Sequence, residues 1–183
     1  NCAALGERWK GTGARADDLC YIAIGQGVGS AIICDGELIY GAACRAGEIG
    51  YLLGEIDQEM SNRNVLGEPG VMERKIWSTL TSCGLNLEQM FQAYVQGKEP
   101  ARGAVTYFIR DLARVIANIA SMLNPEVVVI GGIVAQYMKP VLPDIRAVVG
   151  VLTPIPTRVE LGSLGPWAAA MGAAFQGSVH SKL

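Results

Sequence analysis

The sequence has a single histidine, nearly balanced charge and no long apolar run, and each of these features excludes a class of protein. The histidine is His180, which we expect to be solvated in the tail, and the five cysteines are scattered without paired spacing. Free thiols in a reducing cytoplasm account for such cysteines most simply. The net charge of −2 favours neither nucleic acid nor an anionic membrane surface. No apolar run approaches the ~20 residues of a membrane span, so we expect a cytoplasmic protein with no membrane partner.

What the chain does contain indicates an ordered α/β domain. Its 183 residues are 50% hydrophobic and 17% charged, which argues against disorder and allows one domain with a core. The order of apolar patterns predicts three hairpin-linked strands, helices, a strand, a helix, a strand and a helix. That order predicts a mixed five-stranded sheet flanked by helices. The expected strands cover residues 20–24, 30–34, 37–40, 127–130 and 157–161, and the expected helices 72–81, 87–96, 101–123, a stretch around Pro140 and Pro143, and 166–175. Residues 55–66 are expected to form a loop.

The longest helical signal runs from Ala101 to Leu123. Its apolar residues recur at helical spacing on one face. A second face carries alanines, which would serve either core packing or a subunit interface. The apolar face comprises Val105, Ile109, Leu112, Ile116, Ile119 and Leu123, and the alanines are Ala113, Ala117 and Ala120. Upstream, Asn86 and Gln89 have the spacing of a capping box.

The most informative segment is a glycine-rich turn between the first two expected strands, Gly25-Gln26-Gly27-Val28-Gly29. Such a turn presents backbone N–H groups to an anion, usually a phosphate. The alternative is a hairpin whose glycines are only turns. Glu48 follows on a glycine-flanked loop, and a carboxylate there suits a sugar because sugar hydroxyls donate hydrogen bonds.

The ordered set of motifs resembles the ROK family of repressors, open reading frames and kinases. The motifs are the Asn1–Glu7 segment, the glycine-rich turn, Asp35-Gly36, Ala46-Gly47-Glu48-Ile49-Gly50, and Asn124-Pro125-Glu126 with Val129-Ile130-Gly131-Gly132. The resemblance covers only the C-terminal lobe of a full member. It implies that residues 1–183 form a single C-terminal ROK lobe, one lobe of the actin-like ATPase (ribonuclease H-like) fold, in a piece of a longer protein.

The resemblance also assigns binding residues. It implies nucleotide contacts at the glycine-rich turn and at the paired glycines after the later strand, and sugar contacts on the loop and the following helix. These are Gly25, Gly27, Gly29, Gly131 and Gly132 for a nucleotide, if that site is retained, and Glu48, Tyr51 and Glu73 for a sugar. Structural alternatives stay open: the paired glycines as a tight turn, Tyr51 as loop packing, and Glu73 as a carboxylate favoured at a helix start.

The family's structural zinc site is expected to be missing. Its histidine position holds Tyr51, and its cysteine positions hold Asn64, Leu66 and Val71. None of these is a zinc ligand of the usual kind. We therefore expect no zinc, with apolar packing through Leu66 and Val71 in its place.

The resemblance leaves several functions open. We expect a sugar-sensing effector and dimerisation domain of a ROK transcriptional regulator, binding a small sugar or sugar-phosphate, self-associating, and meeting DNA only through a helix-turn-helix domain outside this sequence. The alternative is the C-terminal lobe of an ATP-dependent, glucokinase-like sugar kinase, with ATP and Mg²⁺ as cofactors in that case only. A third is a non-binding dimerisation domain. The family's catalytic aspartate lies two residues before the position of Asn1, so we assign no catalytic residue and expect no enzyme activity from this chain alone.

Overall fold

A mixed sheet forms the centre of the computed structural model, which describes residues 1–53 and 64–180. Its strand order is β3-β2-β1-β4-β5. β2 pairs antiparallel with both β1 and β3, whereas β4 runs parallel to both β1 and β5. The predicted mixed five-stranded sheet is therefore confirmed. The strands are β1 (Leu19–Ile24), β2 (Val28–Cys34), β3 (Glu37–Ile39), β4 (Val127–Gly131) and β5 (Arg158–Leu161).

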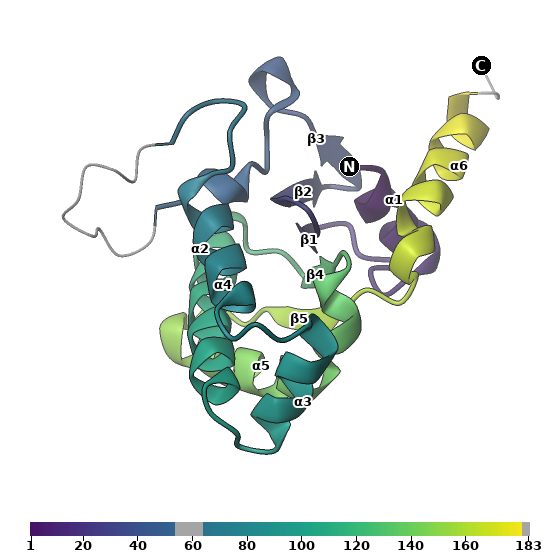
Figure 1. The fold of residues 1–183 in the computed structure, drawn as a ribbon. Coiled ribbons are helices and arrows are strands. Elements are labelled where there is room, and N and C mark those ends of the chain that lie inside the picture. Colours follow the sequence, from purple (N-terminus) through teal and green to yellow (C-terminus); the bar gives the residue numbers. More distant parts are fainter. Residues whose placement is uncertain (54–63, 181–183) are drawn as a thin grey trace.

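Helices cover both faces of this sheet (Figure 1). One face carries α2 (Val71–Thr81), α3 (Leu87–Val95), α4 (Ala101–Leu123) and α5 (Leu142–Leu152). The other carries α1 (Cys2–Lys10) and α6 (Ala168–His180), which pack against each other. Short 3₁₀ helices complete the described elements: η1 (Ala42–Cys44), η2 (Ile49–Tyr51), η3 (Val134–Tyr137), η4 (Lys139–Val141) and η5 (Gly165–Trp167).

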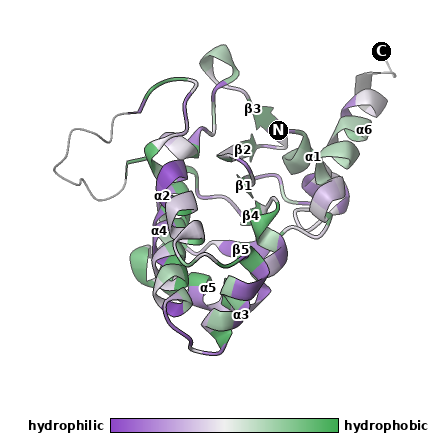
Figure 2. Ribbon diagram, viewed as in Figure 1, coloured by the Kyte–Doolittle hydropathy of each residue, from purple (hydrophilic) through white to green (hydrophobic). Residues whose placement is uncertain are grey.

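The central strands are apolar on both faces because helices bury both faces. Along β1, Cys20, Ile22 and Ile24 point into the core beneath α2 to α5, and Leu19 and Tyr21 into the core beneath α1. All five residues of β4 are buried, and Figure 2 shows this strand coloured hydrophobic between the helical layers. A continuous apolar strand is the pattern expected of a doubly covered sheet.

The long helix α4 has the bounds that the sequence predicts. Its apolar face is buried except at Leu123, which is 41% exposed because the helix ends at the left-handed Asn124 directly after it. Ala113, Ala117 and Ala120 are also buried within the chain. These alanines therefore serve core packing, the first of the two predicted roles.

Other predicted boundaries hold less well. β2 begins at Val28 rather than at Ser30, because the ladder with β1 continues down to Ile24 opposite Val28. The last helix begins at Ala168, since Pro166 lies in a 3₁₀ turn before it. The Asn86 capping box is confirmed.

Two sequence predictions fall partly or wholly outside the described residues. Of the loop expected at 55–66, residues 55–63 are not described, and neither is the side chain of His180. Among the residues that the structure does describe, none of the helices is long and apolar enough to cross a bilayer.

Candidate sugar and phosphate site

The glycine-rich turn is a three-residue connection, 25–27, between β1 and β2. The Gly25 N–H donates to the Gly27 carbonyl at 2.9 Å, and Gly29 lies within β2 opposite Ala23. A side chain at Gly25 or Gly29 would meet open space. The backbone of the turn is therefore open to a closely approaching ligand, which is what the predicted phosphate cradle requires.

The paired glycines lie beside this turn because β4 runs parallel to β1, with Gly131 opposite Ala23. A side-chain carbon at Gly131 would come within 1.9 Å of the Tyr21 hydroxyl oxygen, and one at Gly132 within 2.4 Å of the Ile24 carbonyl oxygen. Gly132 also has a φ of +85°. Packing alone thus requires both glycines, so their nucleotide role stays a prediction.

Glu73 lies in the first turn of α2 and faces the glycine-rich turn. Its Oε2 accepts a hydrogen bond from the Val28 N–H at 3.3 Å. The predicted sugar loop is the segment 46–51, which carries Glu48. A side-chain carbon at Gly50 of this loop would lie only 3.1 Å from the same Glu73 oxygen. Glu73 therefore sits between the two predicted binding segments and joins the start of β2 to the start of α2.

The predicted sugar loop is fixed to β2 through Gly47. The Gly47 carbonyl accepts from the Ser30 N–H at 2.7 Å and from the Ser30 hydroxyl at 2.9 Å. Glu48 follows, exposed and at the start of η2, where its side chain makes no capping hydrogen bond. Ile49 and Gly50 are buried beneath it. The backbone of the loop is held while the Glu48 carboxylate faces solvent, ready to accept hydrogen bonds from a ligand.

Tyr51 is half-buried at the end of this loop and is turned toward the segment before α2. Its hydroxyl accepts from the Gly67 N–H at 3.1 Å, and its carbonyl accepts from the Asn64 amide at 2.6 Å. The structure thus places Tyr51 against the segment that leads into α2, the helix that carries Glu73. Direct contact between Tyr51 and a sugar stays a prediction.

The residues at the family's zinc positions do not fit a zinc ion. Asn64, Leu66 and Val71 offer no thiolate, imidazole or carboxylate. The described residues hold no group of three or more histidine, cysteine or acidic side chains that could bind a metal ion. The expected apolar replacement is wrong for Leu66, which is 66% exposed. The Asn64 amide makes the connection instead, because its oxygen accepts from the Val71 N–H at 2.8 Å.

Cys20 lies on β1, the strand that leads into the glycine-rich turn. Burial raises the pKa of the Cys20 thiol to about 12. A thiol with that pKa is protonated at neutral pH and does not attack a substrate. Cys20 therefore does not supply a covalent nucleophile to this site.

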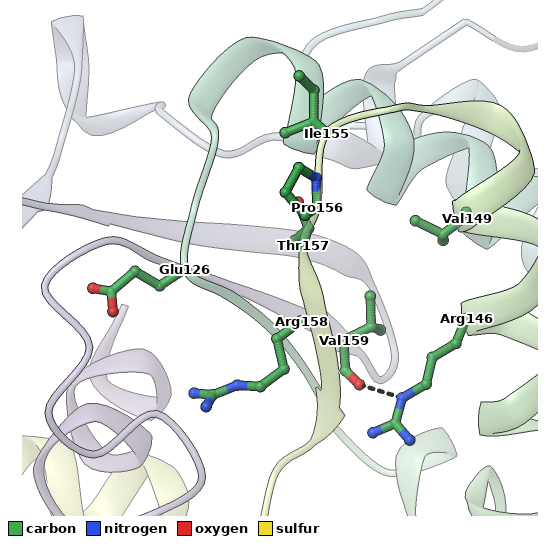
Figure 3. A pocket seen from close by; sticks show the side chains of 9 residues that line it. Glu126, Arg146, Val149, Ile155, Pro156, Thr157, Arg158 and Val159 are labelled. Carbon is green, nitrogen blue, oxygen red and sulfur yellow. Dashed lines mark hydrogen bonds between the residues drawn. The ribbon is translucent and has the colours of Figure 1, made fainter.

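A separate pocket of about 530 Å³ lies at the opposite end of the parallel strands (Figure 3). Glu126 and Arg158 flank the starts of β4 and β5 there, and Arg146 reaches in from α5. Arg146 donates to the Val159 carbonyl at 2.8 Å and pairs with Glu160 at 2.7 Å. Ligands of open α/β sheets bind at the carboxyl ends of strands, so this pocket lies outside the candidate site.

A comparison with protein families matches the ROK family over residues 1–176 of this chain. The chain belongs to the ROK family. The resemblance to that family is thereby confirmed. The closer likeness to its transcriptional regulators stays a prediction, because repressors and sugar kinases match this chain at similar identity.

Two curated relatives illustrate that division. The xylose repressor of Caldicellulosiruptor bescii is 29% identical over 169 residues, covering 81% of this chain and 42% of the relative. The glucokinase of Halalkalibacterium halodurans is 31% identical over 166 residues, covering 80% of this chain and 50% of the relative. The chain spans about half the length of the curated relatives it matches.

The solved structure of the ROK hexokinase of Thermus thermophilus has the same fold. It aligns with a TM-score of 0.80 at 19% identity, covering 100% of this chain and 64% of the hexokinase. The predicted lobe of the actin-like ATPase fold is confirmed by this likeness.

Asn64 is the residue that sequence reasoning missed in this ROK protein. Its position among the zinc-site residues was visible in the sequence, but its polar contacts were not. They link Tyr51 to Val71 across 20 residues of chain, of which only part is described.

Proposed function

We propose that this chain is the C-terminal, sugar-binding lobe of a ROK transcriptional regulator, in which it senses a small sugar or sugar-phosphate and mediates self-association. The observation that carries the proposal is the position of Glu73 between the sugar loop and the glycine-rich turn, with its Oε2 bonded to the Val28 N–H. A carboxylate accepts hydrogen bonds from sugar hydroxyls.

The same contact favours a sensor over a kinase. Two N–H groups at the turn, those of Gly25 and Val28, already have partners within the chain. The negative charge of Glu73 beside the turn repels a polyphosphate by Coulomb's law. The turn is thus less suited to ATP than its glycines alone predict. In the full protein, sugar binding would shift the closure of the two lobes and the geometry of the dimer, and through them the affinity for DNA.

A sugar kinase is the second candidate, and the open space over Gly25 and Gly29 favours it. Mg²⁺ carried by ATP would offset the charge of Glu73. The curated relatives, which include a glucokinase and a xylose repressor, support both candidates.

The experiment uses the full-length protein that contains this chain. Xylose, glucose, other hexoses and N-acetylhexosamines are titrated by calorimetry, and ATP-dependent phosphorylation of the same sugars is assayed in parallel. We expect saturable binding of one sugar without turnover. Turnover would establish the kinase and overturn the sensor, and binding of none of the sugars would overturn both.

Glu73→Gln tests the carboxylate that carries the proposal. It removes the charge at nearly constant shape, and we expect sugar affinity to fall about 10- to 100-fold, the worth of a hydrogen bond to a charged group. Glu37→Gln, at an exposed position on β3, is the matched control and should bind sugar normally. Equal affinities in the two variants would remove Glu73 from the site.

A further inference from the structure

Three hydrogen bonds join the end of the sugar loop to the segment that leads into α2. The Asn64 Nδ2 donates to the Tyr51 carbonyl at 2.6 Å, the Val71 N–H donates to Asn64 Oδ1 at 2.8 Å, and the Gly67 N–H donates to the Tyr51 hydroxyl at 3.1 Å. We call these three bonds the Asn64 clamp. They lie where other ROK members are expected to hold zinc.

The clamp connects the two segments that carry the predicted sugar contacts. Tyr51 ends the loop that begins with Gly47 and Glu48, and Val71 begins α2 two residues before Glu73. The backbones also touch, because a side-chain carbon at Gly70 would come within 2.1 Å of the Gly50 carbonyl oxygen. Close packing brings the segments together, and the clamp fixes their register.

An amide side chain is suited to this position because it both donates and accepts. The Tyr51 carbonyl needs a donor. The Val71 N–H needs an acceptor, since the first N–H groups of a helix have no partner within the helix. Asn64 supplies both from one side chain. An aspartate would serve only the Val71 N–H, and an alanine would serve neither group.

We propose that Asn64 is a positioning residue of the sugar site. It holds the loop that carries Glu48 against the start of α2, so that Glu48 and Glu73 keep a fixed spacing without a metal ion. This inference rests on the proposed function for its consequence in sugar binding, but the clamp itself is testable without a ligand. The asparagine amide does not titrate, so its two hydrogen bonds do not change with pH near neutrality.

The test compares Asn64→Ala, Asn64→Asp and the unaltered full-length protein, with Asn118→Ala on the exposed surface of α4 as the matched control. Amide hydrogen exchange is followed by mass spectrometry over residues 46–52 and over the central strand 127–131. Loss of two neutral hydrogen bonds corresponds to about 10- to 100-fold faster exchange over residues 46–52. We expect that acceleration in Asn64→Ala, a smaller one in Asn64→Asp, and none in the control.

Two exchange results would overturn the proposal. One is unchanged exchange over residues 46–52 in Asn64→Ala. The other is equal acceleration over residues 127–131, which would show general destabilisation instead of positioning. If Asn64→Ala fails to fold, Asn64→Asp decides the question by the same two criteria.

The second readout is affinity for the sugar that binds best in the panel of xylose, hexoses and N-acetylhexosamines. We expect the dissociation constant to rise about tenfold or more in Asn64→Ala, less in Asn64→Asp, and not at all in Asn118→Ala. Unchanged affinity in Asn64→Ala would overturn the positioning role. If the unaltered protein binds none of these sugars, the proposed function fails, while hydrogen exchange still decides whether Asn64 holds the loop.

Discussion

At the scale of single residues, the glycines of the candidate site have different physical surroundings. Gly131 and Gly132 fill places where a side chain would collide with Tyr21 or with the Ile24 carbonyl. Gly25 and Gly29 border open space. Packing therefore explains the first pair but not the second, for which access of a ligand to the backbone stays a prediction.

Substitution by alanine separates these two groups. Gly132→Ala places a side chain at a φ of +85° and against the Ile24 carbonyl oxygen. We expect it to lower the free energy of unfolding by about 2–5 kcal/mol, from backbone strain and overpacking together. Gly25→Ala should change it by less than about 0.5 kcal/mol. Urea unfolding followed by circular dichroism measures both variants, and equal destabilisation would contradict the distinction.

At the scale of elements, a buried carboxylate joins α1 to the segment that precedes α6. Glu7 of α1 is 1% exposed. It accepts from the Thr12 N–H at 2.8 Å and from the Leu164 N–H at 2.8 Å, and Ser163 donates to it as well. The segment that enters α6, near the C-terminus, is thereby fixed to α1, near the N-terminus.

Glu7→Gln should loosen that connection. The glutamine keeps one acceptor oxygen but turns an N–H₂ group toward a backbone donor, which leaves a buried donor unsatisfied. We expect a loss of about 1–3 kcal/mol in the free energy of unfolding. Thermal unfolding measures the loss, with the exposed Glu37→Gln on β3 as the control. Equal midpoints for the two variants would show that Glu7 is not needed for the packing of α1 on α6.

At the scale of the whole molecule, the lobe has a polar clamp at the position of the family's expected zinc site. Asn64, Leu66 and Val71 supply none of the usual zinc ligands. Structural zinc contributes directly to folding where it is bound. A lobe that does not use zinc loses nothing when zinc is removed.

Chelation tests this property in the full-length protein. After dialysis against EDTA we expect an unchanged unfolding midpoint, and metal analysis of the untreated protein should give far less than one zinc per chain. Addition of zinc to a metal-binding ROK relative, with the family's cysteines present, is the positive control. A stoichiometric zinc ion that stabilises this protein would contradict the prediction.

The sequence by itself determined the order of strands and α-helices from β1 to α6, the bounds of α4, the Asn86 capping box and the residues at the family's motif positions. These features depend on periodicity and on capping residues, which act over a few neighbouring positions. Only the tertiary structure decided which glycines are packed, that Glu73 reaches the Val28 N–H, and that Asn64 joins Tyr51 to Val71. Those contacts join segments distant in the sequence, and their partners are set by how the helices and strands pack rather than by any local pattern.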